Sequence, residues 1–207
     1  DVTTPAADYP NIFRTYIVQG AQQTLAQVRQ CEDLGRQPAM RDTILHMLDF
    51  ILTLPATVAQ GLEILERLAP QMEQAGYWES WMPYLQQGLH QSQMFGDTHA
   101  EARLYLWLGI LYQQQSQLAQ AYNHLQQSAT SFATVGDGAN QAKALNRLAY
   151  VARLQRSYTA SQHAVDQALT LLANDDAERS FSYFVQGVIA FDHGDWANAV
   201  EQFQRSI

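Results

Sequence analysis

The sequence has little cysteine, little positive charge and no long apolar run. Cys31 is the only cysteine among 207 residues, which excludes an intramolecular disulfide and a zinc site built from cysteines. There are 12 Lys and Arg against 20 Asp and Glu. We therefore expect no nucleic-acid binding, because duplex binding relies on many cationic contacts to phosphates. The most apolar run, 47–54, contains Asp49 and precedes Pro55, so it is too short for a membrane span of roughly 20 residues.

The sequence also lacks the signatures of catalytic and metal sites. It has no phosphate-binding glycine loop, no Gly-x-Ser-x-Gly elbow, no pair of histidines four residues apart and no His-Glu-x-x-His motif. Asp192, His193 and Asp195 are residue types that bind metals, but they span a predicted turn between helices, where Asp caps and His ends a helix. We expect no enzyme activity, no metal and no cofactor. The single cysteine and the lack of a signal segment favour the cytoplasm.

The sequence does contain an internal repeat, with a period of about 38 to about 40 residues. An apolar residue, then Gly or Asn, then Asp recurs at 95–97, 135–137 and 173–175. A predicted helix end, followed two positions later by a large residue, recurs with nearly the same spacing at 76–78, 116–118, 156–158 and 194–196. Gly or Asn can adopt the left-handed conformation that closes one helix, and Asp can cap the next. Apolar residues between these marks follow helical periodicity, so each period predicts a pair of antiparallel helices.

The predicted fold class is all-α, with about ten helices. We place them near 11–34, 40–53, 56–75, 78–95, 98–114, 117–135, 138–155, 158–173, 177–193 and 196–207. Residues 1–55 form an atypical N-terminal pair or cap, as terminal repeats often do. Four pairs follow at 56–96, 97–136, 137–174 and 175–207, and we expect one continuous domain of a longer chain.

The repeat pattern resembles the tetratricopeptide repeat (TPR) family, whose signature joins a large residue, Leu-Gly and Tyr in one helix to Ala and an aromatic in the next. The best match is Tyr105, Leu108, Gly109, Tyr112, Ala121 and Leu125; the last unit matches at Tyr183, Gly187, Ala190, Gly194, Trp196, Ala199 and Phe203. The resemblance covers 56–207, and its period is longer than the standard one of about 34 residues. Longer units of this kind resemble TPR-like domains of bacterial signalling regulators. The resemblance implies a right-handed superhelical solenoid of antiparallel helix pairs.

In the TPR family the first helix of each pair lines a concave groove, so the resemblance implies which residues touch a peptide ligand. They are Arg103, Leu106, Ile110 and Gln113; Lys143, Asn146, Arg147, Tyr150 and Arg153; and Phe181, Phe184, Val188 and Phe191. Lys143 and Arg147 share a helix face and suit an acidic side chain or terminal carboxylate, while Asn146 suits a peptide backbone. Alternatively, the cations form a solvated face paired with nearby carboxylates. The apolar residues of the last helix in this set, Phe181, Phe184, Val188 and Phe191, either bind peptide or pack under a following repeat or a neighbouring chain.

We therefore expect a non-enzymatic scaffold for protein or peptide binding, with partner segments that carry acidic groups. The alternative is a sensory or regulatory domain of a larger bacterial signalling or transcription regulator that binds a peptide or small effector. The final helix, 196–207, presents apolar residues at helical spacing. Uncovered apolar surface is unfavourable in water, so we expect self-association or continuation of the chain there.

Overall fold

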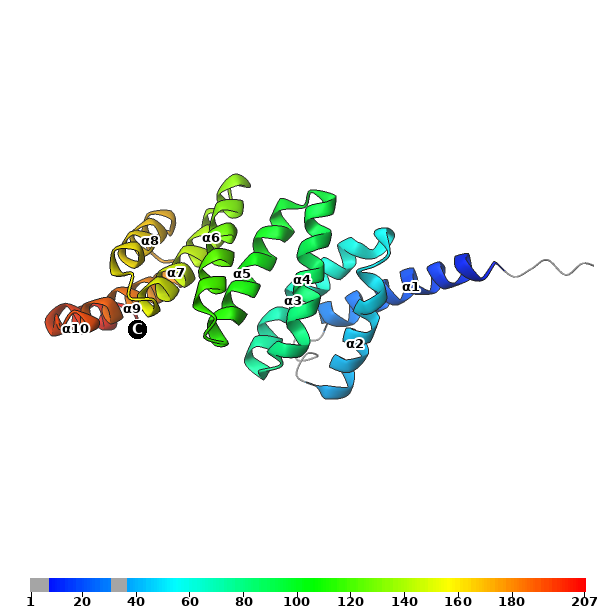
Figure 1. Ribbon diagram of the computed structural model, residues 1–207, viewed down its shortest axis with the longest axis horizontal. Coiled ribbons are helices and arrows are strands. Elements are labelled where there is room, and N and C mark those ends of the chain that lie inside the picture. The colour runs from blue at the N-terminus through cyan, green and yellow to red at the C-terminus, as the bar shows by residue number, and fades with distance from the viewer. Residues whose placement is uncertain (1–7, 31–36) are drawn as a thin grey trace, which may run out of the picture. The chain divides into compact units, whose positions relative to one another are not determined.

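The computed structural model describes residues 8–30 and 37–207, and Figure 1 shows its helices. The described residues form ten α-helices and one short 3-10 helix, with no strand: α1 (Tyr9–Gln30), α2 (Pro38–Ile51), η2 (Pro55–Thr57), α3 (Val58–Ala75), α4 (Trp78–Phe95), α5 (Thr98–Gln114), α6 (Leu118–Thr134), α7 (Gly138–Leu154), α8 (Tyr158–Leu171), α9 (Glu178–Asp192) and α10 (Trp196–Arg205). The all-α prediction is confirmed. Predicted helix ends agree within a few residues, and residues 31–34 of the first predicted helix lie outside the described ranges. Within the described ranges, no helix has the length and apolar character needed to cross a membrane.

The chain divides into two compact units, Asp1–Phe95 and Gly96–Ile207. In unit 1, α1 packs against α2 and α3, and α3 packs against α4. The guanidinium of Arg29 donates to both carboxylate oxygens of Glu63, at 2.8 and 2.6 Å, and so ties α1 to α3. The buried Thr57 hydroxyl donates to the Ile51 carbonyl at 2.8 Å, which fixes the turn between α2 and α3. The predicted continuous domain over 56–207 stays a prediction.

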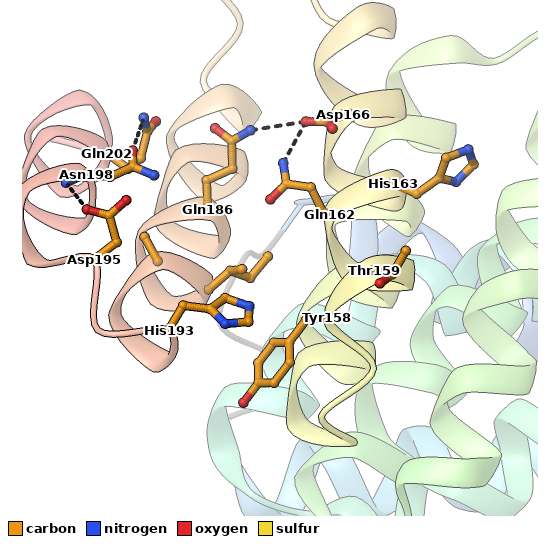
Figure 2. A pocket seen from close by; sticks show the side chains of 12 residues that line it. Tyr158, Thr159, Gln162, His163, Asp166, Gln186, His193, Asp195, Asn198 and Gln202 are labelled. Carbon is orange, nitrogen blue, oxygen red and sulfur yellow. Dashed lines mark hydrogen bonds between the residues drawn. The ribbon is translucent and has the colours of Figure 1, made fainter.

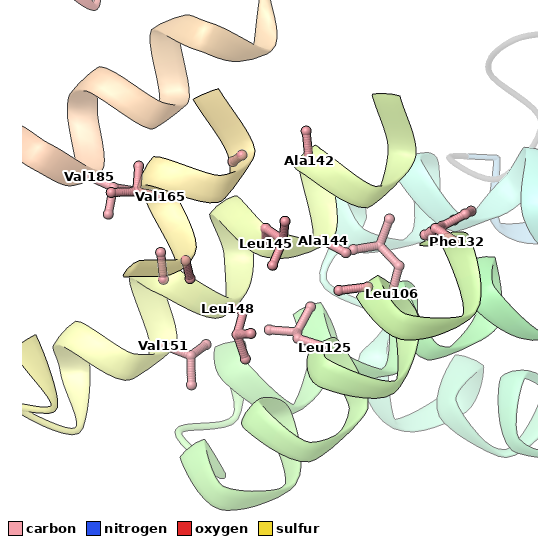
Figure 3. Packing of buried hydrophobic residues seen from close by; sticks show 14 of the residues in the cluster. Leu106, Leu125, Phe132, Ala142, Ala144, Leu145, Leu148, Val151, Val165 and Val185 are labelled. Atoms are coloured by element: carbon pink, nitrogen blue, oxygen red, sulfur yellow. The ribbon is translucent and has the colours of Figure 1, made fainter. Parts of the chain in front are cut away.

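Unit 2 contains three consecutive helix pairs, α5–α6, α7–α8 and α9–α10, and each helix packs against the next. The first helices also touch, α5 against α7 and α7 against α9. Figure 3 shows the core that these helices share, with Leu106, Leu125, Leu148, Val165 and Val185 contributed by α5, α6, α7, α8 and α9 in turn. Burying these apolar side chains is the main stabilising contribution to the unit.

Two glycines at the small-residue position of the repeat allow the helices of a pair to approach closely. A Cβ atom at Gly109 would lie 2.6 Å from Leu125, and a Cβ at Gly187 would lie 2.6 Å from the ring of Phe203. Both distances are shorter than a real carbon contact, so any larger residue would force the two helices or the facing side chain to move. In each pair, a glycine of one helix therefore faces a large side chain of the other helix, and we call these two contacts matched glycine sites.

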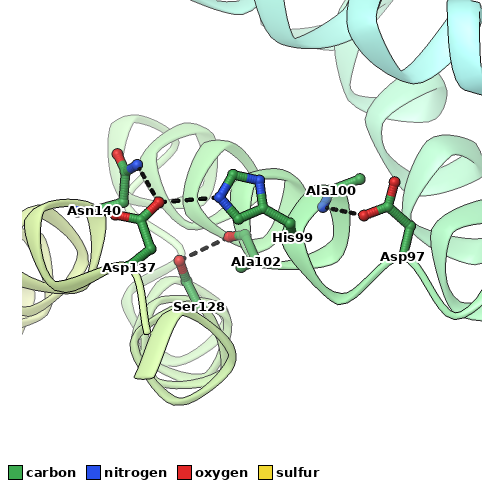
Figure 4. Close-up of polar contacts among 7 residues, drawn as sticks. All are labelled: Asp97, His99, Ala100, Ala102, Ser128, Asp137 and Asn140. Atoms are coloured by element: carbon green, nitrogen blue, oxygen red, sulfur yellow. Dashed lines mark hydrogen bonds and ion pairs between the residues drawn. The ribbon is translucent and has the colours of Figure 1, made fainter. Parts of the chain in front are cut away.

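The turns between helices confirm most of the predicted repeat marks. Gly76, Ser116, Arg156 and Gly194 all have left-handed φ values, 75°, 60°, 61° and 76°. Asp97 and Asp137 accept hydrogen bonds from the backbone amides of Ala100 and Asn140 at 2.9 and 3.1 Å (Figure 4), which satisfies amides that a helix start leaves open.

The third predicted mark, at 173–175, is wrong. Helix α8 ends at Leu171, and Leu172 is extended, so no left-handed residue closes the helix. Asp176, one residue later than predicted, accepts from the amide of Glu178 at 2.9 Å. The segment between α8 and α9 spans 172–177 and is longer than the other turns of unit 2.

Polar ties connect the pairs of unit 2 to one another. His99, at the start of α5, lies 3.0 Å from the Asp137 carboxylate that caps α7 (Figure 4). Desolvation tends to raise the pKa of Asp137, but hydrogen bonds from Asn140 and His99 together hold that pKa below its usual value. Within the first pair, the buried hydroxyl of Ser128 on α6 donates to the Ala102 carbonyl on α5 at 2.8 Å. The His99–Asp137 contact therefore joins one pair to the next, and the Ser128–Ala102 bond joins the two helices of one pair.

Candidate functional site

Six predicted or neighbouring side chains come together on the first helices of unit 2. Trp107 lies on α5, Lys143, Arg147 and Tyr150 on α7, and Phe181 and Phe184 on α9; we call this set the α5–α7–α9 face. All six side chains are partly exposed. Because α7 contacts both α5 and α9, the face is continuous across three helices.

The two cations of the α5–α7–α9 face rest on aromatic rings of the neighbouring helices. The Lys143 ammonium lies 5.8 Å from the ring centroid of Trp107, and the Arg147 guanidinium lies 4.2 Å from that of Phe181. Neither cation has a carboxylate partner among the described residues, and within those residues the buried Nε of Arg147 has no acceptor. A ring face positions a cation without neutralising it, so both charges stay available to a ligand.

Arg153 is a third predicted cation on α7, but its charge is neutralised within the chain. Its Nε and one terminal nitrogen donate to the two carboxylate oxygens of Asp192 at 2.7 and 3.1 Å. The hydrogen bond from Arg153 lowers the pKa of Asp192, and the same bond raises the pKa of Arg153. This paired geometry joins the end of α7 to the end of α9, so Arg153 serves the packing of the two pairs.

Asn146 has a structural environment that the sequence alone does not reveal. It is 0% exposed. Its amide nitrogen donates to the Glu178 carboxylate at 3.0 Å, and its amide oxygen accepts from the Ser182 hydroxyl at 2.9 Å. Both amide groups are occupied within the chain, because a buried polar group must find an internal partner. We therefore leave Asn146 out of the proposed ligand contacts.

The aromatic residues of the α5–α7–α9 face form one cluster. Ring centroids of Tyr150 lie 6.2 Å from both Phe181 and Phe184, and those two rings are 5.8 Å apart. Phe184 also reaches Phe203 of α10 at 6.2 Å. The cluster packs against the core on one side and remains partly exposed on the other. Such a surface can receive an apolar side chain of a partner.

The remaining predicted contacts divide between core and surface. Leu106 and Ile110 are buried core residues, while Arg103, Gln113 and Val188 are partly exposed. Phe191 is 52% exposed and packs edge-on against Trp196, which is 61% exposed. Trp196 and Val200 on α10 are exposed apolar residues, as is Ile207 after the helix, and the expected covering of this end stays a prediction.

Trp107 is not among the ligand contacts predicted from the sequence, although the repeat contains a signal for its place on the face. Trp107 and Arg147 occupy equivalent positions, two residues before Gly109 and Ala149. Lys143 and Phe181 are likewise equivalent, six residues before Ala149 and Gly187. The two cation–ring contacts therefore join the same two repeat positions. Helix α7 contributes both cations, and the rings come from α5 and α9. Comparison of facing positions in successive first helices would have found both contacts.

The polar residues of the turn after α9 have structural partners within the chain. Asp192 pairs with Arg153, and Asp195 caps α10 by accepting from the amide of Asn198 at 3.2 Å. The His193 ring lies 4.6 Å from the ring of Tyr158. Across the described ranges, no group of three or more His, Cys, Asp or Glu is placed to hold a metal ion.

Comparison with known proteins gives a fold and no family. No family model matches the chain. No curated protein is similar to it at a significant level. Among solved structures, the chain is similar to BtubC (BKLC) from P. vanneervenii, with a TM-score of 0.62, 14% sequence identity, and coverage of 93% of this chain and 89% of that chain. At this identity the likeness supports a shared helical fold alone.

Proposed function

We propose that this chain is a non-enzymatic TPR-like scaffold that binds protein or peptide segments carrying acidic groups. In this proposal, the helix pairs stack as a right-handed superhelical solenoid, and the α5–α7–α9 face is the binding surface. The internal repeat of the sequence, the stepwise packing of α5 to α10 and the matched glycine sites support the solenoid.

The pairing of Lys143 and Arg147 with aromatic rings is the observation that carries the binding proposal. The chain has a formal net charge of −8, yet this face presents two cations that have no carboxylate partner among the described residues. Their N–H groups can donate to a carboxylate, and a guanidinium can do so with two parallel bonds. The adjacent cluster of Tyr150, Phe181 and Phe184 can cover an apolar side chain next to that carboxylate.

Affinity capture tests this function. The immobilised chain and a Lys143→Ala, Arg147→Glu variant are exposed to the same lysate, with Arg156→Glu as a matched charge reversal at an exposed residue outside the face. We expect the double variant to lose specific partners that the control variant retains, with equal helicity and melting temperature for all three proteins. An unchanged set of captured proteins contradicts the proposal.

A further inference from the structure

A groove of about 680 Å³, lined mainly by polar residues, opens between α8 and α10, with α9 along its floor. Figure 2 shows Gln162 and Asp166 of α8 on one side, Gln186 of α9 between, and Asn198 and Gln202 of α10 on the other side. Gln186 and Phe184 are two residues apart, or about 200° around a helix. The groove therefore lies on the opposite side of α9 from the α5–α7–α9 face.

The preceding pair has a smaller cavity, about 390 Å³, at the equivalent place between α6, α7 and α8. Five lining positions of the two cavities correspond when the sequence is shifted by one repeat. They are Tyr122, Gln126, Leu148, Ala160 and Ala164 in the first cavity, and Gln162, Asp166, Gln186, Asn198 and Gln202 in the second. Most of these positions are apolar or aromatic in the first cavity, whereas all of them are polar in the second.

The largest difference between the two cavities is at one equivalent position, which is Leu148 in the first cavity and Gln186 in the second. Leu148 is 8% exposed and belongs to the core of unit 2, whereas Gln186 is partly exposed at the equivalent point. Replacing core leucine by glutamine gives up apolar burial that the repeat otherwise keeps. Positions that depart from a protein's own packing pattern are often positions that serve function.

Hydrogen bonding leaves the groove rich in acceptors. One Asp166 carboxylate oxygen accepts from the amide nitrogens of both Gln162 and Gln186, at 2.9 and 3.2 Å (Figure 2). A carboxylate can only accept, so both amides turn their nitrogens to it and leave their carbonyl oxygens open. Within the described part of the chain, those two oxygens and the second Asp166 oxygen have no donor. The lining includes no Lys or Arg.

We propose that this groove binds the guanidinium group of an arginine side chain in a partner peptide. A guanidinium is planar, stays charged and presents five N–H donors, which matches a carboxylate flanked by two amide oxygens. Tyr158 closes one end of the groove, packed on His193, and an aromatic ring favours a neighbouring guanidinium. The site goes beyond the proposed function, because it selects a basic group on a different surface.

Calorimetric titration with three short blocked peptides tests the site. They differ only at one central residue, which is arginine, lysine or the uncharged isostere citrulline. We expect the arginine peptide to bind at least about fivefold more tightly than the lysine peptide, and the citrulline peptide not to bind. Free arginine distinguishes the source of the group. Weaker binding of free arginine than of the peptide supports a peptide partner, whereas equal binding overturns the peptide assignment in favour of a small molecule.

Two variants connect this binding to the groove. Asp166→Asn should weaken the arginine peptide at least about tenfold, while Asp175→Asn, the same change at an exposed residue between α8 and α9, should have no effect. Gln162→Tyr with Gln186→Leu introduces the residue types found at the equivalent positions of the preceding cavity, Tyr122 and Leu148. This double variant should abolish binding without lowering the melting temperature. Lys143→Ala should leave this binding unchanged, so the two sites can fail separately. Equal affinities for arginine and lysine peptides, or equal effects of the two aspartate variants, overturn the proposal.

Discussion

The buried amide of Asn146 provides a prediction that separates packing from ligand binding. Asn146→Ala removes the donor to the Glu178 carboxylate at 3.0 Å and the acceptor of the Ser182 hydroxyl at 2.9 Å. Both Asn146 and Ser182 are 0% exposed, so no solvent replaces the partner that the Ser182 hydroxyl loses. We expect the variant to lose stability while the surface of the α5–α7–α9 face stays intact.

The structure sets the size of that loss. A hydrogen bond to a charged group contributes about 1.5–3 kcal/mol, and a buried polar group left without a partner costs about 1–3 kcal/mol. Asn146→Ala should therefore reduce the free energy of unfolding by about 3–5 kcal/mol. Ser182→Ala removes one neutral bond and leaves the buried Asn146 amide oxygen without its donor, so it should cost about 1–3 kcal/mol. The double variant should cost less than the sum of the two by about 1 kcal/mol, since one hydroxyl is no longer left unpaired.

Urea unfolding of the four proteins in this double-mutant cycle measures both quantities, with exposed Asn123→Ala as a control expected to change stability by less than about 0.5 kcal/mol. If Asn146→Ala loses no more stability than that control, or shows no coupling with Ser182, the structural role is refuted. Weaker peptide binding by Asn146→Ala at unchanged stability would instead return Asn146 to the ligand contacts.

Three further substitutions test local features of the fold. Burial lowers the pKa of His124, so the unfolded chain takes up a proton at this residue before the folded chain does. The free energy of unfolding should therefore fall as pH drops below about 6.5. Between pH 7.5 and pH 5.5, the melting temperature should fall less for His124→Phe than for the unmodified chain. Gly187→Ala drives a Cβ against Phe203 and should cost about 1–3 kcal/mol in urea unfolding, whereas Gly138→Ala, with only one contact at 4.0 Å, should not destabilise. Arg156 is exposed with φ 61°. A left-handed backbone costs a non-glycine residue about 1–2 kcal/mol, and the freedom of glycine in the unfolded chain offsets about 0.4–1 kcal/mol of the gain. Arg156→Gly should therefore raise the free energy of unfolding by about 0.5–1 kcal/mol, and an unchanged value would show that the position is unstrained.

The helix pairs could be predicted from the sequence because their signals are local and repeated. Gly76 and Gly194 close helices, Asp97 and Asp137 cap them, and apolar spacing sets the faces between. The pattern gave a wrong prediction at 173–175, because Asn174 can adopt the left-handed conformation that closes a helix but does not adopt it here. Its conformation depends on the packing of α8 and α9, which the local sequence does not specify.

The candidate site was predictable only in part, because exposure depends on contacts between pairs. Lys143 and Arg147 lie on a shared face, as their spacing of four residues requires. Asn146 has the same sequence character as an exposed polar residue, and its burial follows from Glu178 and Ser182 in the next helix pair. The partner of Arg153 is similarly distant, at Asp192. Long-range polar partners of this kind leave no local signal.

The proposed function is tested most directly by fluorescence anisotropy with one labelled acidic peptide. The peptide carries a glutamate beside an apolar residue, and a charge-reversed peptide carries lysine instead. We predict that the acidic peptide binds the unmodified chain and that Lys143→Ala with Arg147→Glu weakens it about tenfold or more, while Arg156→Glu keeps it within about twofold. Equal affinity for the two peptides, or equal effects of the face and control variants, would contradict the assignment of binding to the α5–α7–α9 face.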